Sequence, residues 1–211
     1  MTQFAVSGQH YLFNVQTFAS VVLSNGGDDY DYAFRDRTTQ GVIADVASGA
    51  SELGVLVETT NTAEALEAAF AEADVEFVEL IQSAPRVALP ATHPLVNATT
   101  LTLDQLDDYP YLTYEQGVEN ALYFAEEVMP AIDRKKNIRV RDRATMTKLL
   151  LGLNGYTVAS GASSKMYSSD IIAVPIKLDD SIRVGLVRCA GLPLSAAGQT
   201  FVAAVRQKVP Q

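Results

Sequence analysis

The chain has 211 residues, with 16 Lys and Arg against 25 Asp and Glu, so its formal net charge is −9. A protein that binds nucleic acid or an anionic membrane needs a basic face, and this acidic balance excludes both as the main activity of this chain. Its longest basic cluster, Arg134-Lys135-Lys136, lies beside Asp133. Hydrophobic content of 48% with 19% charged residues is typical of a folded chain that forms one large domain or two small ones.

Several classes of site are excluded by residue counts. The lone Cys189 rules out a disulfide within the chain, and no apolar run approaches the roughly 18 residues of a spanning helix, so we predict a cytoplasmic protein with no membrane partner. The N-terminus has no signal-peptide pattern. Two His and one Cys give no metal-ligand spacing, and the chain has no GxGxxG motif, so we expect no metal, cofactor or catalytic residue.

The first 75 residues alternate between short apolar strands and amphipathic helices. The predicted strands are Phe4 to Val6, Tyr30 to Phe34 and Leu53 to Val57. Three helices follow these strands. The first carries Tyr11 to Leu23, and the second starts at Thr38 or Thr39. The third starts at Asn61, which has a capping-box spacing to Glu64, and runs through Ala73. This order predicts a doubly wound, parallel α/β sheet with right-handed crossovers.

The middle third repeats the α/β pattern, which predicts two lobes. Further predicted strands are Val75 to Leu80, Pro85 to Leu89, Tyr111 to Thr113, Ile138 to Val140, Tyr156 to Ala159, Ile171 to Ile176 and Ser181 to Arg188. Four further helices are predicted. One carries Leu122 to Met129, and the other three start at Thr102, Thr145 and Ser195. We assign residues 1–82 plus 178–211 to the first lobe and residues 83–177 to the second, with the chain crossing twice.

Small and polar residues follow several of the predicted strands, where open α/β sheets bind their ligands. These junctions are Ser7-Gly8-Gln9-His10, Arg35 to Thr39, Tyr114 to Gly117, Ala144 to Met146 and Ser160 to Ala162. The same residue types are also ordinary helix caps and turn residues. Arg35 and Arg37 have the chemistry to clamp a carboxylate, but Asp31 and Asp36 offer them surface ion pairs instead.

The order of these segments resembles a known family. Arg86 to Leu95 is similar to the "strand, Pro, x, x, His-Pro-Leu" segment of the effector-binding domain of LysR-type transcriptional regulators. Leu101 to Tyr111, with its Thr-Leu-x-x-Leu core before Pro110, resembles the stretch that follows in that family, and Gln40 to Val57 and Gly152 to Gly161 fit it too. The resemblance covers essentially the whole chain.

The resemblance implies a two-lobed fold like that of type 2 periplasmic binding proteins. Each lobe is a mostly parallel sheet flanked by helices, and two strands cross between the lobes. It also implies a cytoplasmic regulator, a homodimer or tetramer, that holds a small-molecule effector between the lobes. Family members contact DNA through an N-terminal winged helix-turn-helix and a linker helix, and this sequence contains neither.

Carried over by position, the resemblance implies effector contacts from both lobes: Ser7, Gln9, His10, Thr38, Thr39, Tyr114, Glu115, Thr145 and Ser160. Helix N-termini with Arg35 or Arg37 favour an organic acid or amino acid as effector, and Glu115 suits an amine group. Two alternatives stay open. One is a solute-binding protein of a transporter, and the other is an enzyme on a related two-lobed scaffold, such as a prephenate dehydratase-like domain.

Overall fold

A computed structural model describes residues 2–117, 123–128, 134–160 and 169–208 of the chain. The strands are β1 (Thr2–Gly8), β2 (Tyr30–Asp36), β3 (Leu53–Thr59), β4 (Val75–Ser83), β5 (Pro85–Pro90), β6 (Tyr111–Tyr114), β7 (Asn137–Val140), β8 (Thr157–Ser160), β9 (Ile171–Pro175) and β10 (Ile182–Cys189). The helices are α1 (Leu12–Asn25), α2 (Thr39–Ala47), α3 (Ala63–Glu72), the 3-10 helix η1 (Leu103–Leu106), α4 (Arg143–Leu153) and α5 (Ala196–Lys208).

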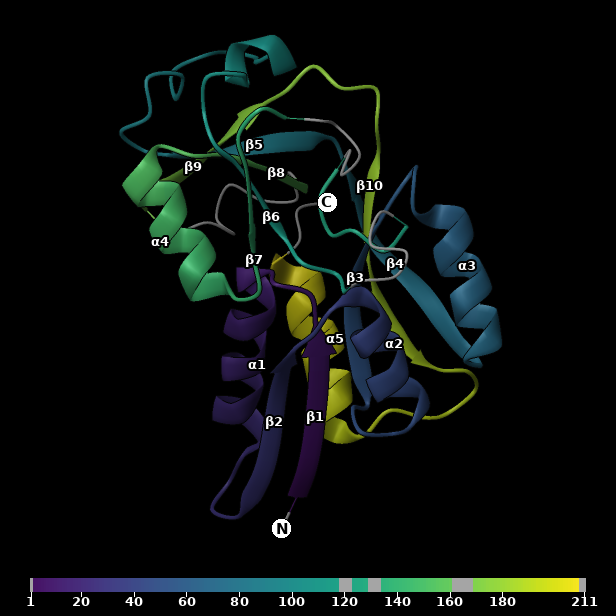
Figure 1. The fold of residues 1–211 in the computed structure, drawn as a ribbon. Helices are drawn as coiled ribbons and strands as arrows, with labels where there is room; N and C mark the ends of the chain where they lie inside the picture. The colour runs from purple at the N-terminus through teal and green to yellow at the C-terminus, as the bar shows by residue number, and fades with distance from the viewer. Residues whose placement is uncertain (1, 118–122, 129–133, 161–168, 209–211) are drawn as a thin grey trace.

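The first lobe is a five-stranded sheet in the order β2-β1-β3-β10-β4, drawn in the lower part of Figure 1. β1 pairs in parallel with β2 and β3, whereas β10 runs antiparallel to both β3 and β4. Helices α1 and α5 pack together on one face, and α2 and α3 cover the other. This three-layer arrangement is the doubly wound α/β architecture that the alternating sequence pattern predicts.

The central strand β3 shows how the sequence specifies these layers. It is buried along its whole length, as expected of a strand with helices on both faces. Val55 and Val57 pack in the cluster on the α1 and α5 side, whereas Leu56 packs in the cluster formed with α2 and α3. Gly54 allows α2 to approach closely, because a Cβ there would lie 2.5 Å from Val42 Cγ1.

The second lobe contains two smaller sheets, β8-β5-β9 and β6-β7. β5 pairs antiparallel with β8 and β9, and β6 pairs in parallel with β7. A parallel bridge between Tyr111 and Tyr156 joins these two parts. In each lobe, therefore, the antiparallel strand is the one that enters from the other lobe, β5 here and β10 in the first. Helix α4 packs on one face through Met146 and Leu150.

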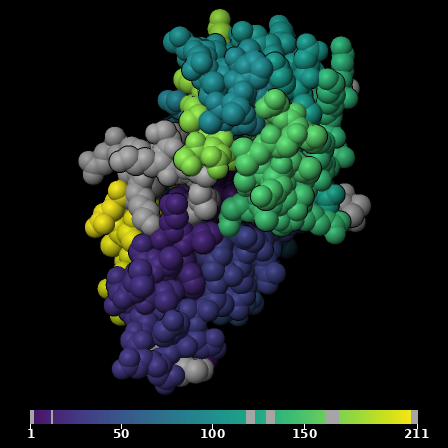
Figure 2. Space-filling model, turned by 90° about the vertical axis from the view of Figure 1, so that its left-hand side faces the viewer, coloured from purple at the N-terminus to yellow at the C-terminus, as the bar shows by residue number. Residues whose placement is uncertain are grey.

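Two extended segments join the lobes. Ala84 alone separates β4 from β5, and residues 176–181 lead from β9 back to β10. Gln82 Nε2 donates to Ser181 Oγ over 2.6 Å, so the two crossings run side by side. Figure 2 shows the result, with the α4 surface (green) of the second lobe meeting the first lobe (purple and blue). The two-lobed fold implied by the resemblance is confirmed.

Three helix predictions are wrong: two helices start at a different residue, and a third is absent from the residues that the structure describes. α3 begins after Thr62, not Asn61, because the Thr62 hydroxyl is engaged with the backbone of Thr59 in a tight turn. α4 begins after Asp142, whose carboxylate accepts from the backbone N–H of Thr145, so Thr145 lies in the first turn instead of opening the helix. The helix predicted over Leu122 to Met129 is absent where the structure describes it, since residues 123–128 form turns and bends. Its remaining residues lie outside the described ranges.

Within the described ranges, no helix combines the length and the apolar character needed to cross a membrane.

The tight contact at Gly54 predicts a packing defect. We expect Gly54→Ala to lower the free energy of unfolding by about 1–3 kcal/mol, because the new methyl group overlaps Val42 in a closely packed layer. Gly152→Ala in α4 is the matched control, since nothing lies within 4 Å of its added Cβ and alanine favours helix by about 1 kcal/mol. Urea unfolding of both variants measures the difference, and equal stabilities would contradict the packing argument.

Candidate functional site

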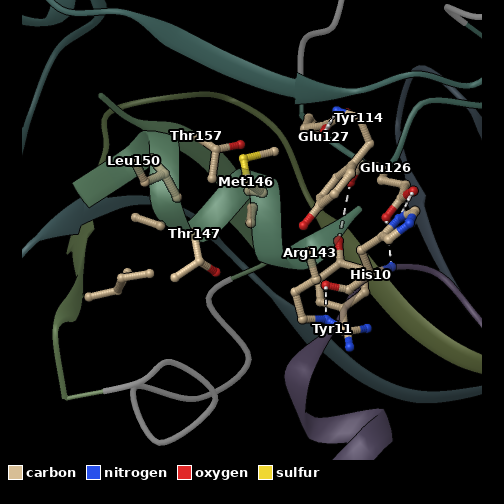
Figure 3. Close-up of a pocket in the computed structure, with 13 residues that line it drawn as sticks. His10, Tyr11, Tyr114, Glu126, Glu127, Arg143, Met146, Thr147, Leu150 and Thr157 are labelled. Carbon is tan, nitrogen blue, oxygen red and sulfur yellow. Dashed lines mark hydrogen bonds and ion pairs between the residues drawn. The ribbon is translucent and has the colours of Figure 1, made fainter. Parts of the chain in front are cut away.

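A cavity of about 250 Å³ lies where the two lobes meet (Figure 3). The junction between β1 and α1 forms its wall in the first lobe, and β5, β6, α4, β8 and β9 form its wall in the second. The described residues that line it are His10, Tyr11, Ala88, Tyr114, Glu126, Glu127, Arg143, Met146, Thr147, Leu150, Thr157, Ala159 and Ile171. A molecule held in this cavity touches both lobes at once.

The two sides of the cavity differ in chemistry. In Figure 3, His10, Tyr114 and Glu126 point toward one another on one side, and Leu150 and Thr147 from α4 lie on the opposite side. The α4 side and the sheet behind it are largely apolar, with Ala88, Met146, Leu150, Ala159 and Ile171 in the wall. Pockets of this kind, apolar with a few convergent polar groups, are typical of small-molecule sites.

Glu126 joins the lobes at the polar side of the cavity. Its carboxylate accepts from the backbone N–H of His10 over 2.9 Å and lies 2.8 Å from His10 Nδ1. It also accepts from Gln116 Nε2 over 2.8 Å. Tyr11, on the same junction as His10, donates its hydroxyl to the Glu126 backbone carbonyl over 3.2 Å. The segment 123–128 is therefore bound to the start of α1.

A chain of hydrogen bonds leads from Glu126 into the first sheet. Gln116 Oε1 accepts from the backbone N–H of Thr39, and Thr39 Oγ1 accepts from Gln9 Nε2 over 2.5 Å. Gln9 Oε1 in turn accepts from the backbone N–H of Val57 in β3. Gln9, Thr39, Gln116 and Glu126 are all buried, and each is hydrogen-bonded, as buried polar groups must be.

His10 is held between charges and a ring. Its side chain is 5% exposed, and its ring stacks on that of Tyr114 with the centroids 4.0 Å apart. Burial lowers the pKa of His10, but the hydrogen bond that its ring makes to the Glu126 carboxylate and the charges of Glu126 and Asp36 outweigh burial, so that the net pKa is raised. The His10–Glu126 contact is thus an ion pair when the imidazole is protonated.

Arg143, the first residue of α4, links the same junction to the second lobe. Its Nη2 donates to Asp36 Oδ1 over 2.7 Å, and its Nε donates to the His10 carbonyl over 3.3 Å. Both bonds cross from α4 to the first lobe. Together with Glu126, Arg143 therefore brackets His10 from the second lobe.

Glu127 is a second buried carboxyl beside Glu126. It is 3% exposed, and its Oε1 accepts from the backbone N–H of Tyr114 over 2.6 Å. Burial and, after it, the charge of Glu126 raise the pKa of Glu127 to about 8, although the Tyr114 N–H opposes the shift. Burial and the Glu126 charge raise the pKa of Tyr114 as well. At neutral pH, Glu127 is therefore mostly protonated.

The structure brings His10 and Tyr114 together in the cavity wall, with Gln9 and Thr39 directly behind them. Thr38 caps α2 by accepting from the Gly41 N–H. Thr38 and Glu115 line a second hollow of about 400 Å³ that also includes His10. Neither Thr38 nor Glu115 is among the described residues that line the first cavity, which is the one drawn in Figure 3.

Three predicted contacts lie elsewhere. Ser7 is buried on the α2 side, where its hydroxyl donates to Asp45 over 2.6 Å. Thr145 is exposed and its hydroxyl donates to the helix-capping Asp142. Ser160 is buried at the end of β8, opposite Pro85 in β5. None of the three is among the described residues that line the cavity.

Four residues of the site were not predicted from the sequence: Gln116, Glu126, Glu127 and Arg143. Gln116 stands in a junction that the sequence indicated, but Glu126 and Glu127 stand in a segment that was expected to be a helix. Two adjacent carboxyls in an otherwise apolar stretch, Leu122 to Val128, were the signal available. As for metals, the described residues contain no group of three His, Cys, Asp or Glu side chains arranged to hold an ion.

Comparisons with known proteins agree with this architecture. The family model "LysR substrate binding domain" matches residues 31–210. Among solved structures, the chain is similar to the effector-binding domain of QuiR in complex with shikimate, with a TM-score of 0.61, 16% identity and coverage of 98% of this chain and 96% of that one. No curated protein sequence matches the chain.

Two further solved structures share the fold. The reduced OxyR regulatory domain from Pseudomonas aeruginosa matches with a TM-score of 0.67 and 15% identity, covering 98% of each chain. The BenM effector-binding domain with its effector benzoate matches with a TM-score of 0.62 and 14% identity, covering 98% of this chain and 91% of that one. At such identities, these likenesses show the fold and do not identify a ligand for this chain.

The ion pair between the lobes predicts a pH-dependent loss of stability in Glu126→Gln. Because the pKa of His10 is raised in the folded state, the pair stabilises fully below the unfolded value of about 6.5 and is lost as the pH rises through the raised value. We expect the variant to be less stable by about 1–3 kcal/mol near pH 6. The difference should shrink toward about pH 9, as measured by urea unfolding.

Glu115→Gln is the control for this experiment. Glu115 pairs with Arg141, whose side chain is 85% exposed, so its loss should cost less than about 1 kcal/mol and change little over the same pH range. A deficit in Glu126→Gln that is as large near pH 9 as near pH 6 would contradict the role assigned to His10.

Proposed function

Since the chain belongs to the LysR substrate-binding domain family, we propose that it is the ligand-sensing domain of a LysR-type transcriptional regulator and binds a small-molecule effector between its lobes. One observation carries this proposal. The cavity of about 250 Å³ is lined by His10 and Tyr11 from the first lobe and by Tyr114, Arg143 and Leu150 from the second. An effector in it therefore interacts with both lobes and is sensitive to their separation.

The proposed signal is a change in the arrangement of the lobes. We take the lobes to be residues 1–82 with 178–211 and residues 83–177, joined by the two crossings. A ligand shifts such an equilibrium only by the difference in its affinity for the two arrangements. Because Glu126 and Arg143 already hold the lobes together at His10, an effector acts by strengthening or replacing these contacts.

The effector contacts that we propose are His10 and Tyr114, which line the cavity among the residues predicted from the sequence. Gln9 and Thr39 support them from behind through buried hydrogen bonds. The effectors named for two relatives, shikimate for QuiR and benzoate for BenM, support a small organic molecule as the ligand class. Ser7, Thr38, Glu115, Thr145 and Ser160 stay predictions of the family resemblance.

We further propose the context that the family implies. The domain acts in the cytoplasm as part of a homodimer or tetramer, and it reaches DNA through a helix-turn-helix segment that is not in this sequence. It binds its effector without transforming it. The net charge of −9 fits a domain that does not itself contact DNA, because the proposed DNA contacts are made by the helix-turn-helix segment.

Filling the cavity tests the proposal. We expect a metabolite library to contain compounds that raise the melting temperature of the wild-type protein, since a ligand at 100 times its Kd stabilises by about 2.7 kcal/mol. Ala159→Leu places a larger side chain in the cavity wall and should abolish the shift. Differential scanning fluorimetry of both proteins with each hit measures this effect.

Ala68→Leu is the matched control, because Ala68 is exposed on α3 in the first lobe, away from the cavity lining. Its response to each hit should equal that of the wild type. Hits that stabilise Ala159→Leu as strongly as the wild type would place the effector site outside this cavity.

A further inference from the structure

The anion position at the β1–α1 junction is already taken by the chain itself. Here the N–H of His10, one residue before the α1 cap Tyr11, donates to the Glu126 carboxylate. The His10 ring and Gln116 Nε2 bind the same carboxylate. An anionic effector group must displace Glu126 to use this position.

The cavity contains one buried acid, Glu127, that has no cationic partner among the described residues. Among the residues that the structure describes, no cationic side chain lies within 4.0 Å of the Glu127 carboxyl, although it is 97% buried and lines the cavity. It accepts hydrogen bonds from the backbone N–H groups of Tyr114 and of Glu127 itself. Ionising a buried carboxyl costs free energy when no cation is near it. Such a group therefore stays protonated unless a positively charged group binds to it.

The cations of the cavity wall do not serve Glu127. His10 pairs with Glu126, and Arg143 pairs with Asp36. When these two pairs are formed, their charges cancel, and Glu127 is the remaining acid among the lining residues that the structure describes. Among the described lining residues, the rest of the wall is apolar apart from the hydroxyls of Thr147, Thr157 and the tyrosines. A ligand with a positive group near Glu127 and a hydrophobic body matches this distribution.

We propose that the cavity selects an effector with an ammonium group on an apolar body, the ammonium binding the Glu127 carboxylate and the body packing against α4. This inference rests on the proposed function and specifies its ligand class. It differs from the shikimate and benzoate named for relatives, which are carboxylates. Those relatives are 16% and 14% identical to this chain, so their ligands do not determine this one.

Binding of such a ligand releases a proton. The pKa of Glu127 is about 8, so near pH 7 the carboxyl is mostly protonated, and the arriving ammonium converts it to the carboxylate while the proton passes to solvent. Glu126, His10, Arg143, Tyr111 and Tyr114 are the other titratable groups around it. The two tyrosines stay neutral because their pKa values are raised, and His10, whose pKa is also raised, is paired with Glu126.

Three probes with one ring and different charge test the ligand class: benzylamine, benzyl alcohol and benzoate. We expect benzylamine to bind at least tenfold more tightly than the other two at about pH 8, measured by isothermal titration calorimetry. Its affinity should rise by up to tenfold per pH unit between about pH 6 and pH 8, as Glu127 loses its proton. Titrations in buffers of different ionisation enthalpy measure the released proton.

The variant Glu127→Gln distinguishes the contribution of Glu127 to ligand preference and proton release from that of His10. The variant keeps the shape of the side chain and cannot ionise, so it should lose the preference for benzylamine and the part of the proton release that depends on Glu127. Glu67→Gln, on the exposed side of α3, should behave as the wild type. Circular dichroism and urea unfolding check that each variant is folded.

The outcomes distinguish the ligand class from the function. Binding of benzylamine that Ala159→Leu removes and Glu127→Gln weakens supports the proposal. Tighter binding of benzoate or benzyl alcohol in the cavity, removed by Ala159→Leu, overturns the ammonium class and leaves the effector site in place. Benzylamine affinity equal in wild type and Glu127→Gln overturns the role of Glu127. Failure of benzylamine to bind at about 10 mM also overturns the inference, while the library screen tests the function independently.

Discussion

The contact on which the site depends is the Glu126 carboxylate at the start of α1. This buried acid binds the His10 backbone and ring and the amide of Gln116, and Gln116 binds Thr39 in the first lobe. A carboxylate excluded from water is stable only when its oxygens are fully hydrogen-bonded or paired. The segment 123–128 therefore requires the first lobe, and the lobes are held in the arrangement that encloses the cavity.

This arrangement places an unusual set of charges around a largely apolar space. Two acids adjacent in sequence have different environments, because Glu126 accepts from the His10 N–H of the first lobe, whereas Glu127 accepts from the backbone N–H groups of Tyr114 and of Glu127 itself. The ionised state of Glu126 disfavours ionisation of Glu127. The lobe contact and the ligand preference that we propose thus share one electrostatic cause.

Much of the fold was predictable because it follows from local patterns. The continuous apolar run of β3, the strand–helix alternation and the short helix that starts at Thr102 were readable from the sequence, and the structure contains each of them. The starts of α3 and α4 were predicted wrongly because Ser, Thr, Asp and Asn compete as caps within a few residues. Which of them caps depends on the turn that precedes the helix.

The sequence by itself determined the α/β class, the two-lobed family fold and the β1–α1 junction that carries His10. Tertiary structure alone decided which side chains meet there. His10 and Glu126 are 116 residues apart, and residues 123–128, which have helical spacing in the sequence, form turns and bends that place the Glu126 carboxylate against the first lobe. Local periodicity carries no information on such a contact, since its free energy exists only when both lobes are folded and in place.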